Sequence, residues 1–124
     1  MDIGEMKRIA EREIDRYREH AAFVRGWIDG GGGGNIAQFR ERQRWVWAVE
    51  RVRMLLEVSE PDKATFFAQY YLLDEPHGRR RERQSMTKLS LELHVSETTL
   101  FRWRNEILLS VAVAAVQSQA LRPF

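Results

Sequence analysis

The chain has 124 residues, enough for one domain, or for one small domain with a helical appendage, that buries a core without covalent staples. It contains no cysteine, which excludes disulfides and thiolate metal sites and agrees with a reducing intracellular setting. The formal net charge is only +2, so any affinity for nucleic acid has to come from where the basic residues lie.

Residues 2–28 are predicted to form one long charged helix. Its apolar residues recur at steps of three and four along one side, namely Met6, Ala10, Ile14, Tyr17, Ala21, Val24 and Ile28. This seam resembles that of a coiled coil, but only a few heptads are present. Packing against another helix of the same chain and a coiled coil between two chains therefore both remain open.

Five consecutive glycines, residues 30–34, follow this helix. Such a tract has almost no helix propensity and behaves as a flexible tether, so we expect it to separate the N-terminal helix from the rest of the chain. A phosphate-cradling loop would need a lysine and then a serine or threonine after the glycines. The chain continues instead with Asn35, Ile36 and Ala37, which argues against that alternative.

A second helix is predicted from Asn35, which can cap it, to about Val58. The residues expected to face the core are Phe39, Val46, Val49, Val52 and Leu56. Trp45 and Trp47 flank this stripe, and arginines interleave with them at positions 40, 42, 44, 51 and 53. Stacking on single-stranded nucleic acid is one interpretation of that pattern. We favour packing against neighbouring helices, since helical aromatic residues at this spacing usually pack.

The sequence Ser-Glu-Pro-Asp at residues 59–62 predicts the start of a third helix. Ser59 is the expected cap, proline is tolerated in the first turn, and Asp62 favours the helix dipole. The helix carries the apolar residues Phe66, Phe67, Tyr70, Tyr71 and Leu72. A polar turn rich in helix breakers, residues 74–78, ends it.

Residues 89–104 have the apolar and capping pattern of a helix-turn-helix. Leu89 and Leu93 lie one helical turn apart, and Ser90 is small enough to let a second helix approach closely. We expect the Ser90 hydroxyl to bond back to a preceding carbonyl. Val95 can fill the gap between the two helices.

The second helix of this motif is predicted to start after Ser96, whose hydroxyl can accept an orphan amide. His94 occupies the turn, a position often given to glycine, because histidine tolerates left-handed backbone better than most residues. Leu100, Trp103 and Ile107 recur at steps of three and four and define the buried stripe. No breaker follows before position 123, so the helix is expected to continue through residues 111–116.

The opposite stripe of the second helix carries the functional expectation. In this motif the first two turns reach the base edges, so the predicted base-reading residues are Glu97, Thr98, Phe101, Arg102 and Asn105. Phosphate anchoring requires basic residues beside that helix. The predicted phosphate contacts are Arg79, Arg80, Arg81, Arg83, Lys88 and Arg104.

Catalytic and metal-binding patterns are absent from the sequence. His20, His77 and His94 are scattered, without a partner four residues away on one helix face. No nucleophile motif occurs, and carboxylates such as Glu11 and Asp15 alternate with arginines at the spacings of ordinary surface ion pairs. We therefore expect a protein that is not an enzyme and that uses no cofactor and no metal.

From residue 55 onward the chain has the order Leu-Leu-Glu helix, Ser-Glu-Pro-Asp restart, aromatic helix and helix-turn-helix. Residues 96–107 are the most telling part, above all Thr99, Phe101, Trp103 and Arg104. This half of the chain resembles the RinA/ArpU family of phage-encoded transcriptional regulators. The C-terminal half of that family is similar to region four of sigma factors, the helix-turn-helix that reads the upstream promoter element. The N-terminal helix and the glycine tract lie outside the resemblance.

The resemblance implies control of phage late or packaging genes by binding near a promoter, with host RNA polymerase as a candidate partner. It also implies that Glu97, Thr98, Phe101 and Arg102 face bases, and that Arg104 and the arginines around Arg80 contact phosphates. Region four alone does not melt DNA, so an accessory activator is favoured over a complete sigma factor. A phage small terminase subunit and a helical interaction protein without DNA binding remain open alternatives.

Taken together, the sequence predicts an all-α helical bundle with a C-terminal helix-turn-helix and a long N-terminal helix on a glycine tether. The expected divisions are residues 1–29, 30–34, 35–76 and 77–124. Duplex DNA is the expected partner. The seam within residues 6–28 and the apolar segment 111–116 exceed what a small monomer exposes, so we also expect a homodimer. The longest apolar run is residues 107–116, far short of the ~20 residues that span a bilayer. The chain also does not begin with the apolar core of a signal peptide. We therefore expect a soluble, cytoplasmic protein with no membrane partner.

Overall fold

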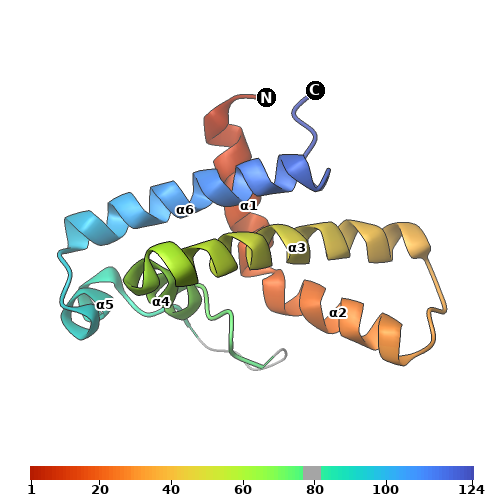
Figure 1. Ribbon diagram of the computed structural model, residues 1–124, viewed down its shortest axis with the longest axis horizontal. Coiled ribbons are helices and arrows are strands. Elements are labelled where there is room, and N and C mark those ends of the chain that lie inside the picture. The colour runs from red at the N-terminus through yellow and green to blue at the C-terminus, as the bar shows by residue number, and fades with distance from the viewer. Residues whose placement is uncertain (77–81) are drawn as a thin grey trace.

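The computed structural model describes residues 1–76 and 82–124, and within them it is helical without a strand, which confirms the predicted all-α class (Figure 1). The helices are, in chain order, α1 (Ile3–Asp15), α2 (Tyr17–Asp29), α3 (Ile36–Ser59), α4 (Pro61–Tyr70), α5 (Met86–Leu93) and α6 (Glu97–Gln117). Within those two ranges, no helix is both long enough and apolar enough to cross a membrane.

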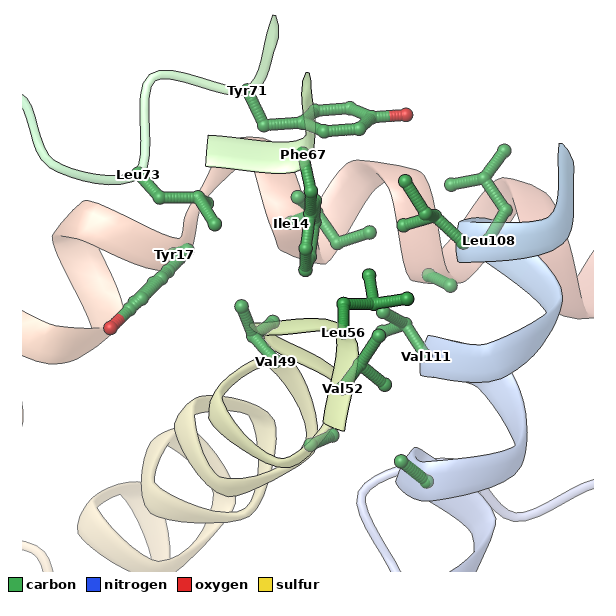
Figure 2. Packing of buried hydrophobic residues seen from close by; sticks show 14 of the residues in the cluster. Ile14, Tyr17, Val49, Val52, Leu56, Phe67, Tyr71, Leu73, Leu108 and Val111 are labelled. Carbon is green, nitrogen blue, oxygen red and sulfur yellow. The ribbon is translucent and has the colours of Figure 1, made fainter. Parts of the chain in front are cut away.

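The two longest helices, α3 and α6, lie side by side and run in opposite directions (Figure 1). α1 crosses α6, α2 runs back along α3, and α4 and α5 cover the end where α3 finishes and α6 begins. The core lies where α1, α3, α4 and α6 meet, and Figure 2 shows Ile14, Val49, Phe67 and Val111 converging there. Each of these four side chains is at most 1% exposed, and burying a side chain of this size contributes about 2 kcal/mol.

The start and the inner face of α3 agree with the sequence. Asn35 caps the helix, because its side-chain oxygen accepts hydrogen bonds from the backbone N–H groups of Ala37 (3.0 Å) and Gln38 (3.2 Å). The predicted core stripe is buried at Val49, Val52 and Leu56 and half-buried at Phe39 and Val46. The two tryptophans differ, since Trp45 is buried and Trp47 is 45% exposed.

The single N-terminal helix predicted over residues 2–28 is wrong, because α1 ends at Asp15 and α2 begins at Tyr17. Arg16 stands between them with φ −94° and ψ 5°. The break lets α1 pack across α6 while α2 packs along α3. Ile14 and Tyr17 both enter the core at the bend, whereas Ile28 is 63% exposed. The apolar seam therefore packs against helices of the same chain.

The glycine tract closes a helical hairpin and does not tether a separate helix. The N–H of Gly32 donates to the carbonyl of Trp27 (2.9 Å), and the Trp27 ring stacks on Phe39 with the ring centroids 4.9 Å apart. Gly32 and Gly34 have φ of +80° and +109°, and a Cβ on either would lie 3.5 or 3.4 Å from the Trp27 ring. A Cβ at these distances would make ordinary contact with the ring, so it is the positive φ, which other residues rarely adopt, that calls for glycine where the chain turns over Trp27. Residues 1–29 and 35–76 share one core as a result.

The restart at residues 59–62 differs from the prediction in one respect. Ser59 is the last residue of α3, and its hydroxyl donates to the carbonyl of Leu55 (2.7 Å), so it does not cap α4. Glu60 is the residue before α4, and its side chain makes no capping hydrogen bond. Pro61 occupies the first turn and Asp62 follows it there, as predicted. Pro61 is sufficient to set the start of the helix, because proline has no N–H and the N–H of the first helical residue would have no partner within the helix.

Candidate nucleic-acid interface

The turn between α5 and α6 is built from short-range hydrogen bonds. The Ser85 hydroxyl accepts the N–H of Lys88 (3.1 Å) at the start of α5. His94 ends that helix in the left-handed region, with φ 56° and ψ 42°, as its place in the sequence predicted. The Ser96 hydroxyl accepts the N–H of Thr99 (3.2 Å) and so caps α6. These contacts fix the angle at which α6 leaves α5.

Ser90 is half-buried in α5, and its hydroxyl bonds differently from the expectation. Its hydroxyl donates forward to the carbonyl of Val95 (2.5 Å) and not back to a preceding carbonyl. The N–H of Val95 donates in return to the carbonyl of Ser90 (3.2 Å). The two residues therefore clamp the turn by a reciprocal pair of hydrogen bonds.

The inward stripe of this unit is buried as predicted. Leu89 and Leu100 are fully buried and Ile107 is 1% exposed. Trp103 is half-buried and packs against Phe66 of α4, with the ring centroids 6.1 Å apart. The α5–α6 unit is thus held on the core through one side of α6, which leaves the other side of the first turns of α6 free of the core.

All five residues predicted to read bases are exposed, and they share the outer side of the first turns of α6; they are Glu97, Thr98, Phe101, Arg102 and Asn105. Phe101 is 51% exposed, an unusual position for a large aromatic side chain. Arg102 lies 3.7 Å from Glu106 across one helical turn, with 65% of its side chain exposed. Contact of this surface with bases stays a prediction.

Glu97 has a partner that the sequence analysis missed. The hydroxyl of Thr87 donates to its carboxylate (2.5 Å), which joins the starts of α5 and α6. Thr87 is exposed at the edge of the same surface. Its position two residues after the cap Ser85 was the available signal, since it places Thr87 in the first turn of α5.

Arg104, one of the predicted phosphate contacts, is engaged within the chain, and its contact with phosphate stays a prediction. Its Nε and Nη2 donate to the two carboxylate oxygens of Glu11 on α1, at 2.9 and 2.6 Å. The Tyr71 hydroxyl donates to the same carboxylate (2.6 Å). Burial raises the pKa of Glu11, but the hydrogen bonds from Tyr71 and Arg104 outweigh it, so the pKa lies below its ordinary value. Glu11 therefore stays charged and fixes Arg104 between α1 and α6.

Arg83 is also engaged within the chain. It forms an ion pair with Asp15, and its guanidinium lies over the rings of Tyr70 and Tyr71, 5.1 Å from each centroid. Burial raises the pKa of Asp15 despite the opposing charge of Arg83. This arginine ties the segment before α5 to α1 and α4, and its contact with phosphate stays a prediction.

Among the predicted phosphate contacts that the structure describes, Lys88 has the most exposed side chain. Its ammonium lies 4.0 Å from Glu92, with 60% of the side chain exposed. Arg79, Arg80 and Arg81 lie outside the described residues, and their role stays a prediction. The basic character of this face thus comes from Lys88 and Arg102 in the described part of the chain.

Two further observations bear on other chemistry. In the part of the chain that is described, no three histidine, aspartate or glutamate side chains gather as a metal-binding group. His20 is buried, and its Nε2 lies 2.7 Å from a Glu13 oxygen.

No protein-family model, no curated protein and no solved structure matches the chain. The functional argument therefore rests on the residues and their geometry.

Proposed function

We propose that the chain is a sequence-specific DNA-binding transcriptional regulator that reads duplex DNA through α5 and α6. One observation carries the proposal above the others. The capped turn at His94 and Ser96 supports a helix whose inner side is buried and whose first turns expose Thr98, Phe101, Arg102 and Asn105. A helix presented in this way fits the major groove, which is about 12 Å wide.

The exposed side chains suit base recognition by their chemistry. An arginine can donate two hydrogen bonds to guanine, and an asparagine can pair with adenine. The ring of Phe101 and the methyl group of Thr98 suit the methyl group of thymine. Glu97 can accept from cytosine, although Thr87 already occupies part of its carboxylate. The mixture of donors, an acceptor and apolar groups is what distinguishes one base pair from another.

The wider role follows the resemblance to RinA/ArpU regulators. By that resemblance the protein activates phage late or packaging genes from a site near the promoter, with host RNA polymerase as its partner. The ion pairs that Arg83 and Arg104 form within the chain reduce the positive charge that this face offers to phosphate. Binding to random DNA should accordingly be weak and sensitive to salt, with base contacts supplying most of the specificity.

Fluorescence anisotropy with random-sequence duplexes over a range of salt concentrations tests the DNA-binding proposal. Lys88→Ala should lower the affinity and flatten the log–log salt slope by ~0.9, the value for one lost phosphate contact. Arg25→Ala is the matched control, since Arg25 is exposed on α2 and belongs to neither helix of the motif. No binding at low salt, or equal slopes for both variants and the wild type, would contradict the proposal.

A further inference from the structure

An apolar patch lies on the surface along α3 and α6. Its members are large apolar side chains with exposed fractions between 41% for Leu109 and 88% for Val58, and they are Trp47, Met54, Leu55, Val58, Leu109 and Val113. A groove of about 430 Å³ runs between the two helices at this place. A single exposed apolar residue is ordinary, but a contiguous group marks an interaction surface.

This patch is not the apolar surface that the sequence suggested for a dimer. Of residues 111–116, Val111, Ala112, Ala114 and Ala115 are at most 4% exposed and belong to the core. The seam of the N-terminal segment is likewise used within the chain at Ala10 and Ile14. The face formed jointly by α3 and α6, in contrast, stays uncovered by the described residues.

One end of the groove is cationic. Arg51 lines the groove and is exposed, and it forms no ion pair with any described residue. Arg44 lies two helical turns before Arg51 on the same side of α3, and its guanidinium is 3.8 Å from a Glu41 carboxylate oxygen. Arg40 lies one turn closer to the N-terminus. This end therefore carries more positive than negative charge.

The other end of the groove, where α3 meets α4, is acidic. Lys63 is buried there and lies 3.6 Å from a Glu60 oxygen and 2.5 Å from a Glu106 oxygen, so one ammonium is shared by two carboxylates. Asp62 is exposed beside them, and Arg102 approaches Glu106 to 3.7 Å. Three carboxylates thus lie with two cations at this end.

We propose that the patch is the interface of a twofold dimer and that its occupant is a second copy of this chain. In an isologous interface each surface meets its own copy in reverse. Pairing α3 with α3 and α6 with α6 in antiparallel fashion places the cationic end of one groove on the acidic end of the other. The apolar residues between the two ends then meet their own counterparts and leave water.

The dimer has a consequence for DNA, and this step rests on the proposed function. Residues 98–102 precede residues 109–113 by eleven positions, which is ~16 Å of helix at 1.5 Å per residue. Antiparallel pairing doubles this separation, so the two reading segments lie ~33 Å apart. That value is close to the 34–36 Å between successive major grooves on one face of B-DNA.

The orientation of two reading residues, Phe101 and Asn105, also agrees with a dimer, whereas Thr98 and Arg102 lie within about 20° of Leu109, on the side of α6 that carries the patch. At 100° per residue, Phe101 and Asn105 lie roughly 80° around α6 from Leu109 and Val113. Ser110, which lines the groove beside α3, lies in the opposite direction around α6 from Leu109. Two copies related by the twofold axis therefore direct Phe101 and Asn105 to the same side. The DNA site should accordingly be a near-palindrome with half-sites one helical turn apart.

Light scattering and sedimentation equilibrium at about 10 μM, without DNA, test the interface independently of DNA binding. The wild type should have twice the 14.6 kDa mass of one chain, and Leu109→Glu should have the mass of one chain with unchanged helical circular dichroism. Ile28→Glu is the control, since Ile28 is 63% exposed on α2, away from the patch, and it should stay dimeric. A monomeric wild type, which would leave the patch to another macromolecule, or a dimeric Leu109→Glu, overturns the proposal without touching the DNA-binding assay.

A charge reversal tests the antiparallel arrangement. Arg51→Glu and Glu60→Arg should each raise the dimer dissociation constant at least tenfold, because each places like charges at both ends of the paired grooves. Mixing the two variants should restore dimerisation as a heterodimer, because both ends then pair opposite charges, one of them with its polarity reversed. Failure of the mixture to associate more tightly than either variant alone would overturn the proposed orientation.

Discussion

The turn between α5 and α6 and the break between α1 and α2 redirect the chain by different means. At the first, His94 adopts a left-handed conformation and the Ser96 hydroxyl caps the next helix. At the second, one ordinary residue, Arg16, separates two helices, and no side chain caps the start of α2. The first turn follows from local residue chemistry. The second is imposed by what each helix packs against.

The packing that imposes the α1–α2 break is visible in its neighbours. Glu13 and His20 lie across the break, 2.7 Å apart and both buried. Burial raises the pKa of Glu13, but the hydrogen bond from His20 and the nearby arginine charges outweigh it and lower the pKa. The Tyr17 hydroxyl donates to Glu50 of α3. These contacts join residues that a straight helix would hold apart.

The largest effect should follow from emptying the core beneath the α5–α6 unit. Leu100→Ala removes a fully buried side chain and should lower the free energy of unfolding by about 3 kcal/mol. Leu91→Ala, at a position that is 73% exposed, should change it by less than about 0.5 kcal/mol. Urea unfolding of both variants gives the comparison. Equal effects would mean that α6 does not pack in the orientation described.

Arg104→Met should lower the free energy of unfolding by about 2 kcal/mol, between the values for exposed and for fully buried ion pairs. Arg102→Met, on the exposed side, should change it by less than about 0.5 kcal/mol. Because the pKa of Glu11 is lowered in the folded state, the contribution of the pair is present above the ordinary pKa of ~4.3 and is lost as the pH falls. The free energies of unfolding of Arg104→Met and the wild type should therefore approach each other as the pH falls from 7 to 3. A difference that stays constant over this range would refute the pairing.

A smaller effect distinguishes the true cap from the mistaken one. Ser96→Ala should lower the free energy of unfolding by about 1 kcal/mol, because the N–H of Thr99 loses its acceptor. Ser59→Ala should have an effect of only a few tenths of that value, since the Ser59 hydroxyl bonds within α3 and caps nothing. Thermal melts of the two variants decide the matter. A larger loss for Ser59→Ala would restore the sequence-based assignment.

The smallest effect has the opposite sign. His94→Gly should raise the free energy of unfolding by about 0.5 kcal/mol, because glycine adopts φ near +56° without a steric penalty. The larger conformational entropy of glycine in the unfolded chain offsets part of this gain. His94→Val should lower it, since a β-branched residue is strained there. If both variants were destabilised alike, the imidazole would hold the turn by contacts and not by its conformational tolerance.

The sequence predicted those features that depend on neighbours along the chain. The Asn35 cap, the left-handed His94 and the continuation of α6 to Gln117 are of this kind. It could not predict that Arg104 meets Glu11, 93 positions away, because no local spacing records that contact. Glu11 and Arg104 each looked like a surface charge by itself. The exposed face of α6 was predictable for the same reason as its buried face, since both follow from one helical period.

The central claim is that Arg102 reads a base and does not merely hold the phosphate backbone. The direct measurement is the affinity of the wild type and Arg102→Ala for a duplex selected from a random library and for random duplexes, at one salt concentration. We expect a loss of about 1–3 kcal/mol on the selected site, roughly 5- to 150-fold, with little change on random DNA. A loss by the same factor on both would contradict it and make Arg102 a phosphate contact.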